Sequence, residues 1–410
     1  MRILWLCHFV PWPPIGHGSL QRSYHLLRVA AATHEVHLLA LAPPSVAAAD
    51  LDLEAATRAL GQLSSAAEIF SLPRDPRKLR RAWLLLSGLP RRQSHWERWF
   101  HSRAMNDRVR ELRGQFDLVH VESVVLGAYR KAIADSPVIL SHHNVESALT
   151  RQRSGTARNV IARSLLVHEA SKLEALERDW APKANVNVVV SELDGMRLSR
   201  LAPQAKVDVV PNGVDTDYFR PVSGVLPEAS TIAFAGGMEW FPNRDAMVHF
   251  ARDIWPRLAS TNENRRAIII GHKPPPELTA LGDSRLEIPG FVPDVRPHIS
   301  RAAIYICPMR VGGGTRLKIL DALAMSRALV STDLGVEGFD LTPEVHFLRA
   351  NTPEEFERQI TRLENDEELR ARLGQAGRAL VENRFSWDVV GKTLLESYER
   401  AAAVAHRTPR

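Results

Sequence analysis

The sequence predicts an α/β protein with two Rossmann-like domains, each a parallel sheet covered by helices. One observation is that short β-rich runs alternate with longer helical patterns along the chain, and another is that this alternation restarts after residue 215. A third is the length, because 410 residues at about 150 per domain correspond to two or three domains. Hydrophobic residues make up 45% and charged residues 24%, which excludes collagen-like, coiled-coil or largely disordered organisation.

The first half carries seven strand candidates, each rich in aliphatic and β-branched residues and bounded by turn residues. They are Arg2–Cys7, Glu35–Leu41, Glu68–Leu72, Asp117–Glu122, Val138–Ser141, Asn187–Val190 and Val207–Val210. Helical periodicity predicts helices between them, for example over Ser19–Ala32 and Ile161–Trp180. Strands that alternate with helices in this way form βαβ units, so we expect a parallel sheet.

The second half repeats the pattern with six strand candidates. They are Thr231–Ala235, Ala267–Gly271, Leu286–Ile288, Ala303–Cys307, Ala328–Ser331 and His346–Leu348. Helices are expected over Asp245–Leu258, Thr315–Met325 and Pro353–Glu364. The turn-forming run Pro211-Asn212-Gly213 separates the two series and predicts domains over 1–211 and 212–386. A final helix over 387–403 follows the second sheet, and we expect it to pack back on the first domain.

The composition narrows the class of protein further. The 53 basic and 47 acidic residues give a net charge of +6, so phosphorylated substrates, anionic lipid and nucleic acid are all candidate partners. Cys7 and Cys307 are the only cysteines, which predicts neither a disulfide framework nor a zinc site and favours a reducing compartment. The apolar run at the N-terminus ends at His8, too early for a signal peptide, and no stretch approaches ~18 apolar residues. We therefore expect a cytoplasmic protein that associates with a membrane at most peripherally.

The segment after the strand at 303–307 is the most informative in the chain. Three glycines, Gly312, Gly313 and Gly314, precede a helix expected to begin near Thr315. Glycines let backbone N–H groups approach an anion, and a helix N-terminus adds unpaired donors. Arg316 and Lys318 supply positive charge, so we predict a phosphate site rather than a plain glycine-rich turn. The pattern is not a Walker loop, because its Gly-Lys-Ser/Thr ending is absent.

Asp321 lies six residues after Thr315 on the same predicted helix. A carboxylate at that place suits the vicinal hydroxyls of a ribose. Alone, Asp321 would be interpreted as a solvated helix charge, and the glycine loop beside it favours the binding role.

Five further segments occur in a specific order along nearly the whole chain. They are Pro13-Pro14-Ile15-Gly16-His17-Gly18, His34-Glu35-Val36, Val209-Val210-Pro211-Asn212-Gly213-Val214-Asp215, Phe234-Ala235-Gly236-Gly237-Met238 and Gly290-Phe291-Val292-Pro293-Asp294. In these motifs the sequence resembles the retaining GT-B glycosyltransferases of family four. The resemblance implies two Rossmann-like domains facing each other across a cleft, and transfer of a hexosyl-type unit from a nucleotide-diphosphate sugar.

The resemblance also implies roles for residues of the first domain. His143 follows the strand at 138–141 and matches the histidine that approaches the donor sugar, with His142 as the near alternative. Gly16 and Gly18 would let the first helix approach the sugar or its phosphate. His120 and Glu122 end the preceding strand and are expected to line the same cleft.

In the second domain, the resemblance places the nucleotide base on the backbone of Gly290, Phe291 and Val292. Arg316 and Lys318 would stabilise the leaving diphosphate, and Asp321 would hold the ribose.

Two departures from the family pattern concern charge. The family's paired glutamates, eight positions apart, are here Gly313 and Asp321, so the first carboxylate is missing. In the first loop of the second domain, Gly237 and Pro242 stand where the family has an Arg and a Lys. The cations available near the donor are then Arg244 and those of the glycine loop, and we infer that positive charge has moved from one loop to the other.

The sequence therefore predicts a metal-independent glycosyltransferase without a cofactor. Its donor is a nucleotide-diphosphate sugar, its acceptor is a saccharide or a lipid-linked molecule, and its expected pathway is envelope or exopolysaccharide synthesis. The only Asp-x-Asp of the second half, Asp215-Thr216-Asp217, falls in the hinge rather than beside a diphosphate.

A nucleotide-sugar epimerase of the same shape and a non-catalytic nucleotide-sugar-binding partner subunit are the alternatives. Nucleic-acid binding ranks last, because no nucleic-acid module is recognisable.

A basic segment over residues 74–103 suggests a membrane contact. Arginines there are interleaved with aromatic residues, among them Trp83, Trp96, Trp99 and Phe100. Basic and aromatic residues together dock helices at anionic membrane interfaces, so we expect peripheral contact with an anionic membrane through this segment. Nucleic-acid binding and an ordinary amphipathic surface helix are the alternatives.

Overall fold

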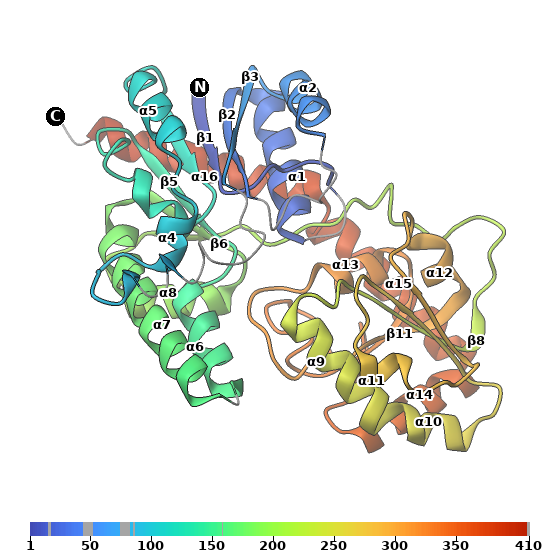
Figure 1. The fold of residues 1–410 in the computed structure, drawn as a ribbon. Helices are drawn as coiled ribbons and strands as arrows, with labels where there is room; N and C mark the ends of the chain where they lie inside the picture. The colour runs from blue at the N-terminus through green and yellow to red at the C-terminus, as the bar shows by residue number, and fades with distance from the viewer. Residues whose placement is uncertain (15–17, 44–51, 74–82, 85–86, 158, 408–410) are drawn as a thin grey trace. The chain divides into compact units, whose positions relative to one another are not determined.

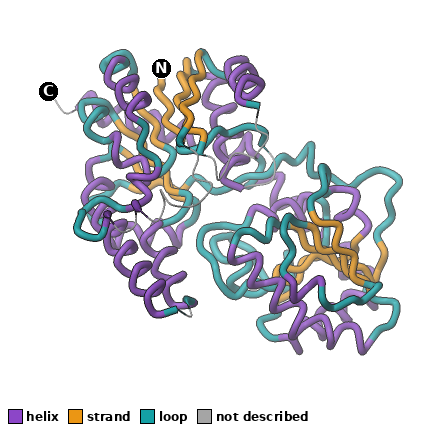
Figure 2. The backbone as a smooth tube through the Cα atoms, in the orientation of Figure 1, coloured by secondary structure: helices purple, strands orange, loops and turns teal. Residues whose placement is uncertain are grey.

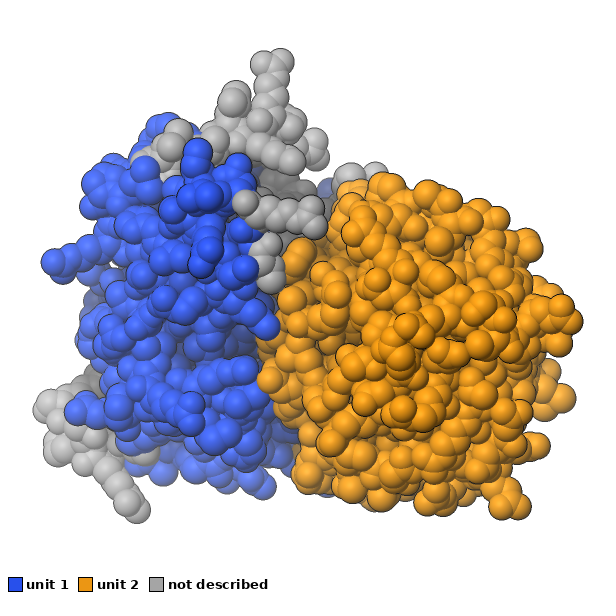
Figure 3. All heavy atoms as spheres, turned by 90° about the horizontal axis from the view of Figure 1, so that it is seen from below, with its two compact units in different colours: residues 1–211, 391–410 blue, residues 212–390 orange. Residues whose placement is uncertain are grey.

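In the computed structural model the chain forms two compact units. Unit 1 comprises Met1–Pro211 and Gly391–Arg410, and unit 2 comprises Asn212–Val390 (Figure 3). The structure describes the chain except for residues 15–17, 44–51, 74–82, 85–86, 158 and 408–410. Each unit is a parallel β-sheet with helices on its faces, as Figure 2 shows, which confirms the predicted pair of Rossmann-like α/β domains. No helix among the described residues is both long enough and apolar enough to cross a membrane.

Unit 1 is built on a seven-stranded sheet in the order β3-β2-β1-β4-β5-β6-β7 (Figure 1). The strands are β1 (Arg2–Cys7), β2 (Glu35–Ala42), β3 (Ala66–Ser71), β4 (Leu118–Val121), β5 (Val138–His142), β6 (Val186–Val189) and β7 (Val207–Val209). Central strand β1 is almost wholly apolar and buried, as expected for a parallel strand covered on both faces. The chain order reverses between β1 and β4, and in open α/β sheets ligands bind at such a switch point, beyond the carboxyl ends of the strands.

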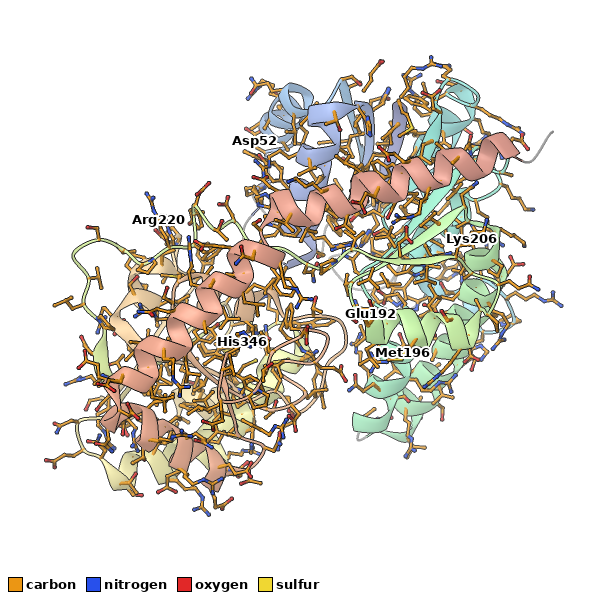
Figure 4. All side chains as sticks on the ribbon, turned by 180° about the vertical axis from the view of Figure 1, so that it is seen from behind. Asp52, Glu192, Met196, Lys206, Arg220 and His346 are labelled. Carbon is orange, nitrogen blue, oxygen red and sulfur yellow. The ribbon has the colours of Figure 1, made fainter. Side chains whose placement is uncertain are left out.

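Several helices of unit 1 begin at residues whose side chains cap them. For example, Asp52 accepts hydrogen bonds from the amides of Glu54 and Ala55 at 3.0 Å, which starts α2 (Figure 4). Before residue 212, the described residues form the α-helices α1 (Gly18–Thr33), α2 (Leu53–Leu63), α4 (His95–Trp99), α5 (Arg103–Glu111), α6 (Glu146–Thr156), α7 (Val160–Trp180) and α8 (Glu192–Leu201).

Unit 2 has a six-stranded sheet in the order β10-β9-β8-β11-β12-β13. The strands are β8 (Glu228–Ala235), β9 (Arg266–Ile270), β10 (Leu286–Gly290), β11 (Ala302–Cys307), β12 (Ala328–Ser331) and β13 (Leu348–Arg349). Its α-helices are α9 (Phe241–His249), α10 (Trp255–Thr261), α11 (Pro276–Thr279), α12 (Arg296–Arg301), α13 (Leu317–Ala324), α14 (Pro353–Asn365) and α15 (Glu367–Arg384). The switch point of this sheet lies between β8 and β11, so the carboxyl ends of those two strands are where a ligand is expected.

The last helix, α16 (Trp387–Arg407), passes from unit 2 into unit 1. Its beginning is fixed in unit 2, where the amide of Trp387 donates to the carbonyl of Val214. In unit 1 its Tyr398 is buried, and the Tyr398 hydroxyl lies 2.9 Å from Nδ1 of His120. The helix therefore contributes a polar contact beneath β4 as well as apolar packing.

The predicted elements differ from the structure chiefly at helix boundaries. The single helix expected over Asp245–Leu258 is α9 and α10 joined by a π-helical turn at Phe250–Ile254. Pro256 explains the interruption, because proline has no N–H to donate to a carbonyl in the preceding turn. The helix expected near Thr315 begins at Leu317.

The membrane role expected for Trp96, Trp99 and Phe100 is wrong. Trp99 and Phe100 belong to the core of unit 1, and Trp96 packs against that core. A capping box between Ser94 and Glu97 starts α4 and turns its aromatic face inward, where burial of the rings is favourable. Residues 74–82 and 85–86 of the same basic segment lie outside the described part of the chain.

Candidate functional site

The glycine loop of unit 2 follows β11 at the switch point of the sheet. Gly312 has a φ of 138° and Gly314 a φ of 66°, both in the region that side chains other than glycine rarely adopt. A Cβ atom on Gly312 would also lie 3.3 Å from the guanidinium of Arg316. The loop thus needs glycine for its backbone path, and it delivers the chain directly into the first turn of α13, where N–H groups lack helical acceptors.

Lys318 is held at this switch point by residues from two other elements. Its Nζ hydrogen-bonds to Oδ1 of Asn243 on α9 and lies 4.4 Å from the centroid of the Phe234 ring on β8. A Cβ atom on Gly236 would be 2.7 Å from the same Nζ, so glycine leaves the space the ammonium occupies. Burial lowers the pKa of Lys318 to about 8, and at pH 7 the side chain is mostly charged.

Asp321 lies one turn further along α13. Its Oδ1 is buried and has no hydrogen-bond partner among the described residues. Burial raises the pKa of Asp321 to about 8, although the charge of Lys318 acts in the opposite direction. A buried oxygen without a partner is costly, and a ligand hydroxyl would satisfy it.

Arg316 stabilises the conformation of the glycine loop through contacts with its backbone. It is buried, its Nη1 donates to the carbonyl of Gly314 at 2.6 Å, and the same nitrogen lies 3.7 Å from Oε2 of Glu337. Thr315 is fixed as well, since its hydroxyl accepts from Nδ2 of Asn212 at 2.6 Å. These contacts give the glycine loop a defined conformation before any ligand binds.

The structure brings some of the other predicted donor residues to Lys318 but not all. The carbonyl of Gly237 accepts from Nδ2 of Asn243 at 2.8 Å, so Gly237 shares a partner with Lys318. Arg244 is exposed on α9. Gly290 ends β10, which lies two strands from β8, and Phe291 beyond it is exposed, as expected of a residue that a base could cover.

Sequence reasoning missed Asn243, Phe234 and Glu337. An Asn at the start of a helix normally indicates only a cap or a turn, and nothing in its spacing points to a lysine 75 residues away. These residues become visible only when the sheet topology brings β8, α9 and α13 together.

In unit 1 the predicted histidine lies above a buried carboxylate. Nε2 of His143, after β5, is 3.1 Å from Oε1 of Glu122, after β4. The Ser23 hydroxyl donates to the same oxygen at 2.8 Å, and Nε2 of His120 is 3.1 Å from the other oxygen. Neither His120 nor Glu122 is exposed, so the expectation that they line a cleft is wrong: both are buried, and Glu122 lies against His143.

The ionisation states around His143 differ from one another. Burial lowers the pKa of His8 to about 3 and that of His142 to about 4, so both rings are neutral at pH 7. Burial alone would raise the pKa of Glu122, but its contacts with His120 and His143 outweigh this and hold it well below the usual value. Nε2 of His142 lies 3.1 Å from Oδ1 of Asn187, which gives His142 a structural contact rather than an open one.

Among the described residues, the other positions predicted from the sequence add no further polar side chain to the candidate site. Gly18 begins α1, and Gly16 lies outside the described residues. The hinge Asp215 accepts from the amides of Asp217 and Tyr218, which is a local turn. Within the described part of the chain no group of three or more His, Cys, Asp and Glu side chains is arranged to hold a metal ion.

Two family models match the sequence. The model for glycosyltransferase family 4 matches residues 21–218, and the model for glycosyl transferases group 1 matches residues 229–366. The chain is a glycosyltransferase. The first match lies almost wholly in unit 1 and the second lies within unit 2, so both units of the glycosyltransferase carry the relationship.

Solved structures show that this glycosyltransferase has the GT-B fold. Sucrose-phosphate synthase from Thermosynechococcus elongatus is 16% identical with a TM-score of 0.73, and covers 98% of this chain and 100% of its own. HepE from Anabaena, in complex with UDP and glucose, is 14% identical with a TM-score of 0.66, covering 97% and 99%. TarM from S. aureus, in a mutant complex that includes UDP, is 7% identical with a TM-score of 0.66, covering 97% and 99%. No curated protein matches the sequence closely enough to count as a relative.

Proposed function

We propose that this glycosyltransferase moves a hexosyl-type unit from a nucleotide-diphosphate sugar to a saccharide or lipid-linked acceptor, in a cytoplasmic step of envelope or exopolysaccharide synthesis. The observation that carries the proposal is the glycine loop with the half-buried Lys318 ammonium and the unpartnered Asp321 oxygen at one switch point. The HepE structures, which contain UDP, UDP with glucose, or UDP-glucose, support a nucleotide-sugar donor.

The loop amides and Lys318 bind the diphosphate in this proposal. Asp321 binds the ribose hydroxyls, and the backbone of Gly290–Val292 receives the base. Because Arg316 is already engaged with Gly314 and Glu337, we assign it to shaping the loop rather than to direct contact with phosphate. Arg244 is exposed and remains available for the outer phosphate.

The transfer breaks the bond between the anomeric carbon and the diphosphate oxygen, so negative charge develops on the leaving diphosphate. Preorganised N–H donors and the Lys318 ammonium stabilise that charge, which is why we propose a metal-independent reaction. In unit 1, Glu122 fixes the orientation of His143, and His143 positions the sugar or the acceptor. Retention of the anomeric configuration is part of the proposal.

The absence of a carboxylate at Gly313 favours one competing function, that of a non-catalytic nucleotide-sugar-binding subunit. The phosphate loop would also serve a nucleotide-sugar epimerase.

A single experiment separates these functions. The protein is incubated with a panel of nucleotide sugars in EDTA, with saccharide acceptors, with lipid-linked acceptors and without acceptor, and products are identified by mass spectrometry and by the NMR coupling of the anomeric proton. We expect acceptor-dependent transfer with the donor's anomeric configuration. A new epimeric nucleotide sugar without acceptor would indicate an epimerase, and donor binding without product would indicate the binding subunit. Activity that EDTA abolishes would contradict the metal-independent mechanism.

A further inference from the structure

We infer that the beginning of α7, with the segment around Leu89, is a docking face for an anionic lipid bilayer. This inference goes beyond the transfer reaction and does not depend on the proposed function. The α7 face consists of the apolar Trp83, Leu89, Val160, Ile161 and Val167 and the basic Arg91, Arg92 and Arg163.

The first turns of α7 present apolar side chains to solvent. Val160 is 76% exposed, Ile161 is 73% exposed and Val167 is 39% exposed. Val160, Arg163 and Val167 are three and four residues apart, so they form one stripe along the helix. Asn159 caps the helix by accepting from two amides, at 2.9 and 3.1 Å, so the exposed residues stand on a regular helix.

The segment around Leu89 lies beside α7 and adds further exposed residues to this stripe. Nε2 of His168 on α7 lies 3.0 Å from the carbonyl of Leu89, and Nζ of Lys172 donates to the carbonyl of Gly88 at 2.7 Å. Leu89 is itself exposed, and Trp83 is 62% exposed with the Arg98 guanidinium 5.3 Å from its ring centroid. Two parts of the chain about eighty residues apart are thus held together, so that Leu89 lies near the end of the α7 stripe at Val167 and His168.

The charge of the α7 face identifies its partner. The described residues 159–168 contain no Asp or Glu, and neither do residues 87–96. Exposed apolar side chains beside arginines without acidic neighbours fit a surface that offers both hydrocarbon and negative charge, which an anionic bilayer does. A second copy of the chain fits poorly, because it would bring the same uncompensated arginines together.

The place of the face in unit 1 agrees with this partner. Figure 1 shows α6 and α7 running side by side beyond the sheet of unit 1, so the beginning of α7 stands away from the sheet core. A projecting helical pair can bring its tip to a flat surface without unfolding.

The test is co-sedimentation of the full chain with vesicles. One set contains phosphatidylglycerol and phosphatidylcholine in equal parts, and the other contains phosphatidylcholine alone. We expect binding to the anionic set that weakens at high salt.

The triple variant Arg91→Glu, Arg92→Glu, Arg163→Glu should lower the partition coefficient by at least about a hundredfold, since each arginine near an anionic surface contributes roughly fivefold. The double variant Val160→Ser, Ile161→Ser should weaken binding at any salt concentration.

The matched control makes the same charge change on exposed arginines of unit 2, with Arg220→Glu, Arg358→Glu and Arg372→Glu (Arg220 is labelled in Figure 4). Circular dichroism and thermal melting verify that all variants are folded. Equal loss in the control and the α7 triple variant, or no binding of the wild type to anionic vesicles, would overturn the inference. A dimer in sedimentation velocity that Val160→Ser, Ile161→Ser dissociates would overturn it too, because the face would then be covered by a second copy.

Discussion

Lys318 and Asp321 stand one helical turn apart, both with a pKa displaced towards 8 by burial. At pH 7 the lysine is therefore mostly charged and the aspartic acid mostly protonated. The pair then carries a net positive charge, which suits a site that receives an anion. Above pH 8 this advantage is lost, because the lysine releases its proton while the aspartate becomes charged.

Replacing Asp321 with Asn should stabilise the free protein, and the gain should grow with pH. The folded-state pKa of about 8 lies above the ordinary value of 3.8, so the contribution of Asp321 to stability is complete below pH 3.8 and is lost as pH rises towards 8. Urea denaturation of wild type and Asp321→Asn at pH 5 and pH 8 measures this. A difference in unfolding free energy that is the same at both pH values would contradict it.

Glu122→Gln should destabilise the protein, in contrast to Asp321→Asn. Because the folded-state pKa of Glu122 lies well below 4.5, its stabilising contribution is present above pH 4.5 and is lost as pH falls through the folded-state value. We expect the variant to lose about 2 kcal/mol at neutral pH, the magnitude of a hydrogen bond to a buried charged group. The loss should shrink in acid. Ser23→Ala, which removes a single hydrogen bond to the Glu122 carboxylate, is the control and should show a smaller loss with a weaker pH dependence.

At the scale of elements, the sequence predicts the glycine loop well because glycines, cations and a following helix are adjacent in the chain. It misses the exact start of α13, since Arg316 turns inward to Glu337 instead of opening the helix. The sequence also predicts Gly237 as the donor-site glycine of this loop, whereas Gly236 is the glycine that packs against Lys318. Contacts between α9 and α13 depend on sheet topology, which local patterns do not encode.

This distinction gives a matched pair of substitutions. A methyl group on Gly236 would lie 2.7 Å from Nζ of Lys318 and 2.9 Å from Nδ2 of Asn243, whereas one on Gly237 meets nothing within 4 Å. Gly236→Ala should displace the lysine and lower the affinity for a nucleoside diphosphate by about tenfold or more, the magnitude of one charged hydrogen bond. Gly237→Ala should leave it nearly unchanged. Isothermal titration of both variants decides the matter, and equal effects would show that the Lys318 position does not govern binding.

For the whole molecule, thirteen predicted strands are present in the structure, because parallel sheets covered by helices leave continuous apolar runs in the sequence. The expected cleft residues His120 and Glu122 are instead buried, and α16 returns to unit 1 and places Tyr398 against His120. That contact joins residues 278 positions apart, and no periodicity predicts it. The same limit applies to the α7 face, which two separate segments form together.

The most direct test of the account is calorimetric titration of wild type and Lys318→Ala with nucleoside diphosphates of different bases, starting with UDP, in the absence of added metal. The account predicts that one diphosphate binds the wild type, that Lys318→Ala reduces its affinity at least about tenfold, and that wild-type affinity falls as pH rises above 8. Equal binding by both proteins, or no binding of any nucleotide by the wild type, would contradict the claim that the glycine loop and Lys318 hold the donor diphosphate.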